Sequence, residues 1–196
     1  MARWEAGSRQ RLEAAAVELY AEQGFAATTV VQVAERAGVT ERTFFRHFAD
    51  KREVLFANEP ALTEILAEAV RAAPAGSEAV RSGLVAIARE LQPRHADLVR
   101  RGRIIAANQE LRERELLKLA SWTAALEDAL VERGEPAEHA ALAAAIGVAV
   151  LNVAARYWLA GDGGELVTFL DTALRDAAPG DRGRPPYPAP VRSGPG

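Results

Sequence analysis

A short stretch of the sequence holds most of the side chains that could do chemistry. Thr40 and Thr43 carry hydroxyl groups, and His47 offers two ring nitrogens. Arg42 and Lys51 add positive charge, and an arginine guanidinium can bind the O6 and N7 atoms of guanine together. All of these groups can form hydrogen bonds with phosphate oxygens or with base edges. The residue types therefore indicate a surface that contacts nucleic acid.

The rest of the chain offers little that could catalyse a reaction. It has no cysteine, and its histidines, His47, His95 and His139, are not spaced as metal ligands. It also lacks a glycine-rich phosphate loop with its lysine and a serine at a nucleophile elbow. We expect no catalytic residue, no metal and no cofactor. An enzyme built on scattered carboxylates is an alternative, as is a helical interaction module, although the module would leave the polar residues at 40–47 unexplained.

Two short helices joined by a glycine turn must position these side chains. Thr28 or Thr29 can cap the first helix, and Gly38 can end it. Thr40 can cap the second helix, whose Phe44 would face a core. Helices of two turns are not stable alone in water, so each needs a packing partner. The pattern predicts a helix-turn-helix, with the start of its second helix directed at base edges.

Apolar residues recur at helical spacing along the rest of the chain, which predicts an all-α fold of about nine helices. A helix over 8–23, capped by Ser8, precedes the helix-turn-helix. Asp50 can cap a further helix that stops before Pro60. Further helices are predicted over 60–73, 77–91, 94–107, 109–133, 136–160 and 164–177.

Composition divides the chain into three parts. We predict a helix-turn-helix DNA-binding domain over 1–58, a helical ligand-binding and dimerisation domain over 59–178, and a disordered tail rich in proline and glycine over 179–196. The first part holds equal numbers of basic and acidic residues, eight of each, so its net charge is zero. DNA binding would therefore depend on a few placed contacts rather than on bulk charge.

The sequence predicts no membrane segment. Its most apolar run, 140–155, is rich in alanine and includes Asn152, and we expect it to form a buried helix. The first residues are polar and charged, which differs from the apolar core of a signal peptide. The absence of cysteine suits a reducing compartment. We expect a cytoplasmic protein without a membrane partner.

The stretch from Thr28 to Lys51 resembles the N-terminal domain of the TetR family, the tetracycline-repressor-like regulators. The matching positions are Thr29, Val33, Ala34, Ala37, Gly38, Val39, Thr40, Thr43, Phe44, Phe45, His47, Phe48 and Lys51. The resemblance implies a homodimeric regulator that binds a palindromic operator in double-stranded DNA. It also implies release by a small-molecule effector. Repression is the expected outcome, and activation is compatible with the same pattern.

The resemblance also assigns roles to individual residues of the helix-turn-helix. Thr40 would cap the recognition helix and meet a phosphate, while Glu41 and Arg42 would reach base edges. Phe45 departs from the family pattern, because a tyrosine that bonds phosphate is usual there. Glu41 could instead pair with a nearby arginine, and His47 could make only a local hydrogen bond. The predicted DNA-binding residues are Thr29, Thr40, Glu41, Arg42, Thr43, Phe45, His47 and Lys51.

For the larger part, the resemblance implies a ligand-binding core and a dimer formed through residues 136–177. Packing of these helices within one chain only is the alternative. Trp122 could line a ligand cavity, and Asn152 and Arg156 share one face of a helix because they lie four residues apart. A buried Asn152 must find a hydrogen-bonding partner, which could be internal or a ligand. These three residues are the predicted ligand contacts.

Overall fold

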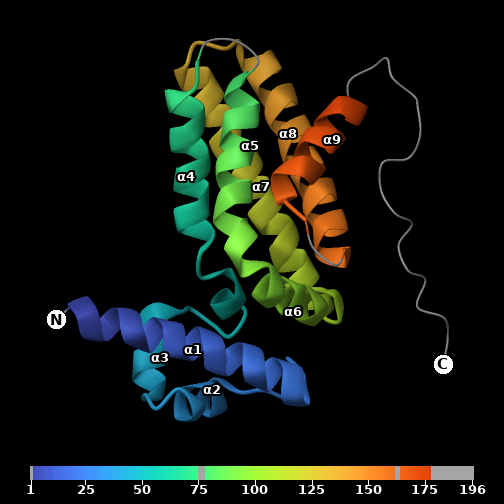
Figure 1. Ribbon diagram of the computed structural model, residues 1–196. Helices are drawn as coiled ribbons and strands as arrows, with labels where there is room; N and C mark the ends of the chain where they lie inside the picture. Colours follow the sequence, from blue (N-terminus) through green and yellow to red (C-terminus); the bar gives the residue numbers. More distant parts are fainter. Residues whose placement is uncertain (1, 75–77, 162–163, 178–196) are drawn as a thin grey trace. The chain divides into compact units, whose positions relative to one another are not determined.

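The computed structural model describes residues 2–74, 78–161 and 164–177 (Figure 1). Within these ranges the regular structure consists of nine α-helices and two short 3-10 helices, and no strand occurs among the described residues. The predicted all-α fold is confirmed. The tail predicted to be disordered, 179–196, lies outside the described residues.

The chain divides into two compact units. The first unit consists of Met1–Pro60 and Val99–Lys118, and the second of Ala61–Leu98 and Leu119–Gly196. The sequence predicts a first domain of residues 1–58 alone. The segment 99–118 joins the first unit because its apolar side chains are buried in that unit's core. These side chains are Ile104, Ile105 and Leu111.

Three helices begin the first unit, and they contact one another in all pairs: α1 (Ala2–Gln23), α2 (Val30–Arg36) and α3 (Glu41–His47) (Figure 1). The expectation that Ser8 caps the first helix is wrong, because α1 begins at Ala2 and Ser8 is buried inside it. Ser8 precedes the buried Leu12 by four residues, so the two side chains share one face of α1.

The segment after the helix-turn-helix also differs from the expectation. Only the 3-10 helix η1 (Glu53–Phe56) forms there, although the Asp50 carboxylate does accept hydrogen bonds from the backbone N–H groups of Arg52 and Glu53, at 2.7 and 3.3 Å. The next helix, α4, already begins at Glu59. Pro60 therefore lies in the first turn of α4, where a proline is tolerated, and does not end a helix.

Two arginines hold the segment 99–118 onto η1. Arg101 and Arg114 lie over the ring of Phe56, with guanidinium carbons 4.8 and 4.5 Å from its centroid. We call these three residues the arginine clasp. Arg114 also forms ion pairs with Glu53 at 2.7 Å and Glu59 at 2.6 Å. The clasp thus joins residues that lie far apart in the sequence.

The second unit is a bundle of longer α-helices, each within one or two residues of its predicted span, with a short 3-10 helix that was not predicted. Their bounds are Glu59–Ala72 (α4), Glu78–Leu91 (α5), Gln92–Arg94 (η2), His95–Ala106 (α6), Gln109–Glu132 (α7), Ala137–Ala160 (α8) and Leu166–Ala177 (α9). Parts of α6 and α7 belong to the first unit. Helix α5 contacts both α8 and α9, which also pack on each other.

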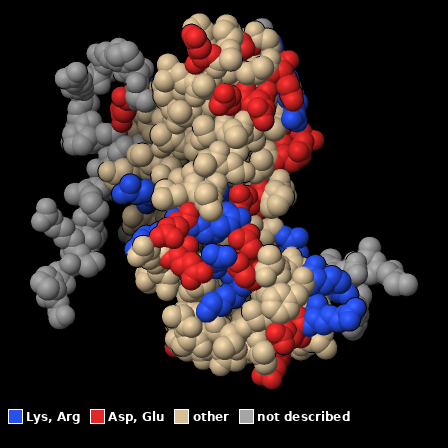
Figure 2. Space-filling view, turned by 180° about the vertical axis from the view of Figure 1, so that it is seen from behind, with Lys and Arg blue, Asp and Glu red and all other residues tan. Residues whose placement is uncertain are grey.

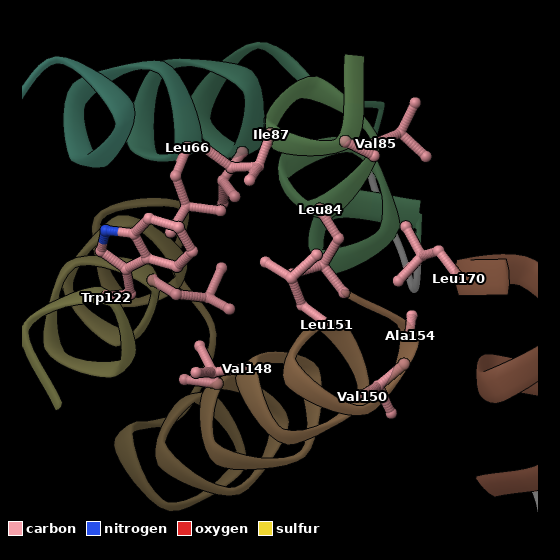
Figure 3. Packing of buried hydrophobic residues seen from close by; sticks show 14 of the residues in the cluster. Leu66, Leu84, Val85, Ile87, Trp122, Val148, Val150, Leu151, Ala154 and Leu170 are labelled. Carbon is pink, nitrogen blue, oxygen red and sulfur yellow. The ribbon is translucent and has the colours of Figure 1, made fainter. Parts of the chain in front are cut away.

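The core of the second unit is apolar. Leucine, valine and alanine side chains from α4, α5 and α8 pack together with Trp122 of α7 (Figure 3). Gly147 of α8 allows close packing, because a Cβ atom there would lie 2.8 Å from Cγ1 of Val80. Helix α8 is long and apolar enough to cross a membrane by length and composition alone, but core helices pass the same test, and eight of its residues are buried here.

Candidate DNA-binding site

Local hydrogen bonds fix the start of α2 and the turn that follows it. Thr29 caps α2 through a reciprocal pair of bonds: its hydroxyl accepts from the Gln32 backbone at 3.2 Å, and its own N–H donates to the Gln32 side chain at 2.9 Å. Gly38 has a φ of +66°, a conformation that favours glycine and lets the chain reverse. These features set α3 directly after the turn, as the sequence predicted.

The start of α3 presents the residues expected to read base edges. Thr40 caps the helix, because its hydroxyl accepts a hydrogen bond from the Thr43 backbone N–H at 3.2 Å. The Thr40 and Thr43 hydroxyl groups also lie 3.0 Å apart and bond to each other. Glu41 and Arg42 follow in the first turn, and both are exposed. A polar and accessible helix start is what base readout requires.

The two phenylalanines in the middle of α3 have opposite environments. Phe44 is fully buried, whereas the side chain of Phe45 is 51% exposed. Their rings meet edge to face, with centroids 5.5 Å apart. Phe44 therefore anchors the helix in the core and steadies a second aromatic ring on the outer surface. An exposed ring can contact a sugar or a thymine methyl group.

His47 at the end of α3 has a partner that the sequence analysis did not find. Its Nε2 atom lies 2.9 Å from the hydroxyl oxygen of Ser8 in α1, and the His47 ring is half-buried. The signal in the sequence for a buried Ser8 was its position one helical turn before the buried Leu12, which places both residues on the same face of α1. That position was interpreted as a helix cap instead.

Lys51 is bonded within the first unit. Its Nζ atom donates to the carbonyl oxygens of Phe25 and Thr28, at 2.8 and 2.9 Å, and lies 4.3 Å from the centroid of the Phe25 ring. The carbonyl of Lys51 accepts a hydrogen bond from the Tyr20 hydroxyl at 2.6 Å, and burial raises the pKa of this phenol, with Asp50 adding to the effect. The lysine thus holds the loop between α1 and α2, a role that the sequence analysis missed.

Several arginines of the first unit are engaged in the same way. Arg11 donates to the carbonyl of Ala37 at 3.0 Å, and Arg36 pairs with Glu22 at 3.0 Å. Arg42 and Arg46 are also exposed, but within the described part of the chain no hydrogen bond or ion pair joins their side chains to another residue. On the face shown in Figure 2, lysine and arginine side chains are interleaved with aspartate and glutamate. The exposed arginines of α3 are therefore the strongest candidates for DNA contact.

The predicted ligand contacts have different environments in the second unit. Trp122 is buried in the apolar core, Asn152 is half-buried on α8, and Arg156 is exposed on the same helix. Of the three residues, Trp122 is therefore the one placed in the interior of the unit, and Arg156 is the one placed at its surface.

Helix α8 also exposes large apolar side chains on one face. Leu142 is 62% exposed, Ile146 47% and Val153 38%. Their spacing of four and then seven residues places them on one side of the helix. We call these three residues the α8 outer face. They belong to the span expected to form a dimer.

A short helix, a glycine turn and a second helix with an exposed polar start define the helix-turn-helix class of DNA-binding proteins. Comparison with known families identifies the group within this class. The model for bacterial regulatory proteins of the tetR family matches residues 12–57. The model for the MftR C-terminal domain matches residues 75–182, more than half of the chain. The chain belongs to the TetR family and is a DNA-binding transcriptional regulator, not an enzyme.

A similar regulator supports this assignment. Over 75 residues, 38% of this chain, the sequence is 41% identical to the HTH-type transcriptional regulator TcmR of Streptomyces glaucescens. The match spans 33% of the length of that relative.

Solved structures share the fold. FadR from Bacillus subtilis, in complex with stearoyl-CoA, is 21% identical with a TM-score of 0.60, and the match covers 85% of this chain and 95% of that chain. FadR from Thermus thermophilus, in complex with lauroyl-CoA, is 22% identical with a TM-score of 0.55 over 89% and 100%. A complex of SmeT with triclosan is 20% identical with a TM-score of 0.57 over 86% and 90%. At these identities the likeness shows the fold.

Proposed function

We propose that this protein is a ligand-responsive repressor that binds a palindromic operator as a homodimer. The first unit would be the DNA-binding domain, and the second would bind the ligand and form the dimer. The proposal places the protein in the cytoplasm. The observation that carries it is the start of α3, where Glu41 and Arg42 are exposed on a helix held by a cap, a glycine turn and a buried phenylalanine.

In this proposal α3 enters the major groove. Arg42 and Glu41 would contact base edges, and Phe45 would contact a sugar or a thymine methyl group. Thr29, Thr40, Thr43, His47 and Lys51 would face the phosphates of the two flanks. The bonds that Lys51 makes to backbone carbonyls favour a supporting role, in which it holds the loop before α2 and adds its charge. Binding would then depend mainly on α3 itself.

The α8 outer face supports a homodimer through residues 136–177. A monomer would leave Leu142, Ile146 and Val153 in contact with water, which is unfavourable for side chains of this size. A second copy of the same face would cover them with a self-complementary surface. A stable interface of this kind buries about 1,200–2,000 Å² in total. We expect Ile146→Glu to give a monomer in sedimentation, with Glu138→Gln on the same helix as a control that stays dimeric.

The apolar core of the second unit favours a hydrophobic effector. The buried side chains that pack between α4, α5, α7 and α8 are hydrocarbon, apart from the indoles of Trp122 and Trp158 (Figure 3). The ligands bound in these similar structures, stearoyl-CoA, lauroyl-CoA and triclosan, each carry a large apolar portion. In this proposal Trp122 contacts the apolar part, while Asn152 and Arg156 contact any polar end. Ligand binding would favour a dimer in which the spacing of the two recognition helices does not match successive major grooves. The affinity for DNA would then fall.

Two measurements test the proposal. First, the wild-type protein selects duplexes from a random library, and its affinity for a selected duplex is measured against salt concentration. We expect the selected sequences to be palindromic and the affinity to fall steeply with salt. Second, stearoyl-CoA, lauroyl-CoA and triclosan are added as probes to the complex with DNA, and at least one should release it. Equal affinity for selected and random duplexes would contradict the DNA-binding role, and intact complexes with all three probes would contradict a hydrophobic effector of these classes.

A further inference from the structure

Gln32, the third residue of α2, has a side-chain amide that is fixed in one orientation. Its oxygen atom, Oε1, accepts a hydrogen bond from the backbone N–H of Thr29 at 2.9 Å. A backbone N–H can only donate, so the atom that it meets must be the amide oxygen and not the amide nitrogen. The Thr29 hydroxyl and the side-chain nitrogen of Gln23 also donate to Oε1, each at 3.2 Å. Donors from the cap of α2 and from the end of α1 therefore hold this one oxygen.

The nitrogen atom of the same amide, Nε2, remains available. Within the described ranges no hydrogen bond joins it to another residue. Nε2 is also accessible to solvent, because Gln32 has no atom among the buried side-chain nitrogen and oxygen atoms that lack a hydrogen bond there. A primary amide nitrogen carries two N–H donors. Gln32 therefore presents two donors at the surface, in a direction that its oxygen sets.

The engaged oxygen restricts what these donors can bind. A glutamine that reads adenine uses its oxygen and its nitrogen together, and in Gln32 the oxygen is already occupied. A phosphate oxygen only accepts hydrogen bonds, so it suits a group that offers donors alone. In a helix-turn-helix the first helix crosses the DNA backbone while the second enters the major groove. Helix α2 is the first of the two helices here, so Gln32 lies on the helix that meets phosphates.

We infer that Gln32 binds DNA directly, by donating from Nε2 to a phosphate oxygen while its Oε1 completes the cap of α2. The inference rests on the proposed function, because it requires α3 to lie in the major groove. The hydroxyl proton of Thr29 is used within the cap, so Gln32 would supply the hydrogen-bond donor at this end of α2. Gln23 and Thr29 already hold the amide in the free protein, so binding costs little ordering of this side chain.

The variant Gln32→Glu removes the donor and keeps the cap. A glutamate retains an oxygen for the Thr29 N–H, and glutamate is itself favourable at this position of a capping box. Its second carboxylate oxygen replaces the NH₂ group and repels a phosphate. We expect the affinity for one duplex selected by the wild-type protein to fall about 10- to 100-fold, the range for losing a hydrogen bond to a charged group. The midpoint of urea unfolding should stay at the wild-type value.

The matched control is Gln10→Glu, the same chemical change at an exposed position of α1. Both variants carry the same net charge, so the control measures the effect of charge without a contact. We expect Gln10→Glu to lower the affinity by less than about threefold, because an exposed charge away from the DNA is screened by salt. Equal losses in the two variants would overturn the inference, because they would assign the effect to net charge.

Neutral phosphates in the DNA test whether a phosphate is the partner. A methylphosphonate replaces one phosphate of each half-site at a time in the same duplex. At the phosphate that Gln32 contacts, loss of the charge weakens wild-type binding and removes the repulsion in Gln32→Glu. The difference between the two proteins should therefore narrow to about threefold or less at that position. A residue that only caps α2 would give the same difference at every phosphate.

The remaining outcomes separate the inference from the proposed function. If the wild-type protein selects a sequence but Gln32→Glu binds it equally well, the inference fails and the proposed function stands. The inference also fails if no methylphosphonate narrows the difference, or if Gln32→Glu selects a different base at one position, which would indicate base readout. If the wild-type protein selects no sequence, the proposed function fails, and the inference fails with it.

Discussion

Different kinds of interaction stabilise the interior of each of the two units of this protein. The first unit has an apolar core, and arginine and lysine side chains reinforce it by bonding to backbone carbonyls and carboxylates, as Lys51 does at the start of α2 and Arg114 does in the arginine clasp. The second unit is built mainly from leucine, valine and alanine side chains packed between helices. Polar contacts require particular residues at particular positions, whereas an apolar core accepts many combinations of similar volume. The first unit should therefore tolerate fewer substitutions at these polar positions than the second unit tolerates in its apolar core.

The largest effect in this comparison should come from the apolar core. Leu84 is fully buried between helices of the second unit (Figure 3). Leu84→Ala should lower the free energy of unfolding by about 2–5 kcal/mol, because it removes buried methyl groups and leaves a cavity. Urea unfolding measures this change, and Leu116→Ala, at an exposed site, is the control. Similar losses in both variants would contradict the account of the second unit.

Ion pairs should matter more in the first unit than in the second. Arg114 is 18% exposed and pairs with two glutamates, whereas Arg81 in the second unit is 44% exposed and pairs with Asp171. Arg114→Ala should lower the free energy of unfolding by about 2–3 kcal/mol, because it leaves two partly buried carboxylates without their positively charged partner. Arg81→Ala should lower the free energy of unfolding by less than about 1 kcal/mol, because its ion pair is exposed to solvent. The comparison breaks if the two variants unfold at the same urea concentration.

Acid should weaken the first unit through its carboxylates. Burial raises the pKa of Glu115, but Arg101 and Lys118 outweigh this and hold it below its usual value, and the hydrogen bond from Arg52 lowers the pKa of Asp50. A carboxylate with a lowered pKa in the folded state stabilises the protein above its unfolded-state value, and this contribution disappears as the pH falls through the folded-state value. We expect the free energy of unfolding to decrease as the pH is lowered from about 5 to 3.

The variant Glu115→Gln isolates one part of this pH dependence. It has no carboxylate to protonate at this position, so its free energy of unfolding should fall less steeply over the same range. Hydrogen exchange in the segment 99–118 would locate the change in the first unit. A pH profile identical to that of the wild-type protein would show that Glu115 does not contribute.

The smallest effect concerns the exposed ring of α3. Phe45→Tyr adds the hydroxyl group that is usual at this position in the TetR family and that can bond a phosphate. Affinity for DNA should rise about two- to tenfold, and it should rise alike for all sequences because phosphate contacts carry no sequence information. Fluorescence anisotropy measures the affinity of each variant for selected and for random duplexes. A gain confined to selected sequences would indicate that residue 45 reads bases instead.

The sequence predicted the helix-turn-helix well because its signals are local. Thr29, Gly38 and Thr40 each act on residues within one turn, and the structure places a cap, a turn and a cap at these positions. The helices of the second unit followed from periodicity and from glycine and proline. Their ends were predicted to within one or two residues.

Contacts between distant residues could not be predicted in the same way. Ser8 and His47, Lys51 and Phe25, and Arg114 and Glu53 meet only when the chain folds. Nothing in the spacing of a single sequence pairs these residues, and each also has a plausible local interpretation as a cap or a solvated charge. The placement of segment 99–118 in the first unit was missed for the same reason.

The central claim is that the start of α3 reads DNA sequence, and the most direct measurement is the sequence preference of Arg42→Ala. The wild-type protein, this variant and Arg46→Ala, at another exposed arginine of α3, each select duplexes from the same random library. The account predicts that Arg42→Ala loses preference at one position of each half-site, whereas Arg46→Ala keeps the wild-type preference. An unchanged preference in Arg42→Ala would contradict it.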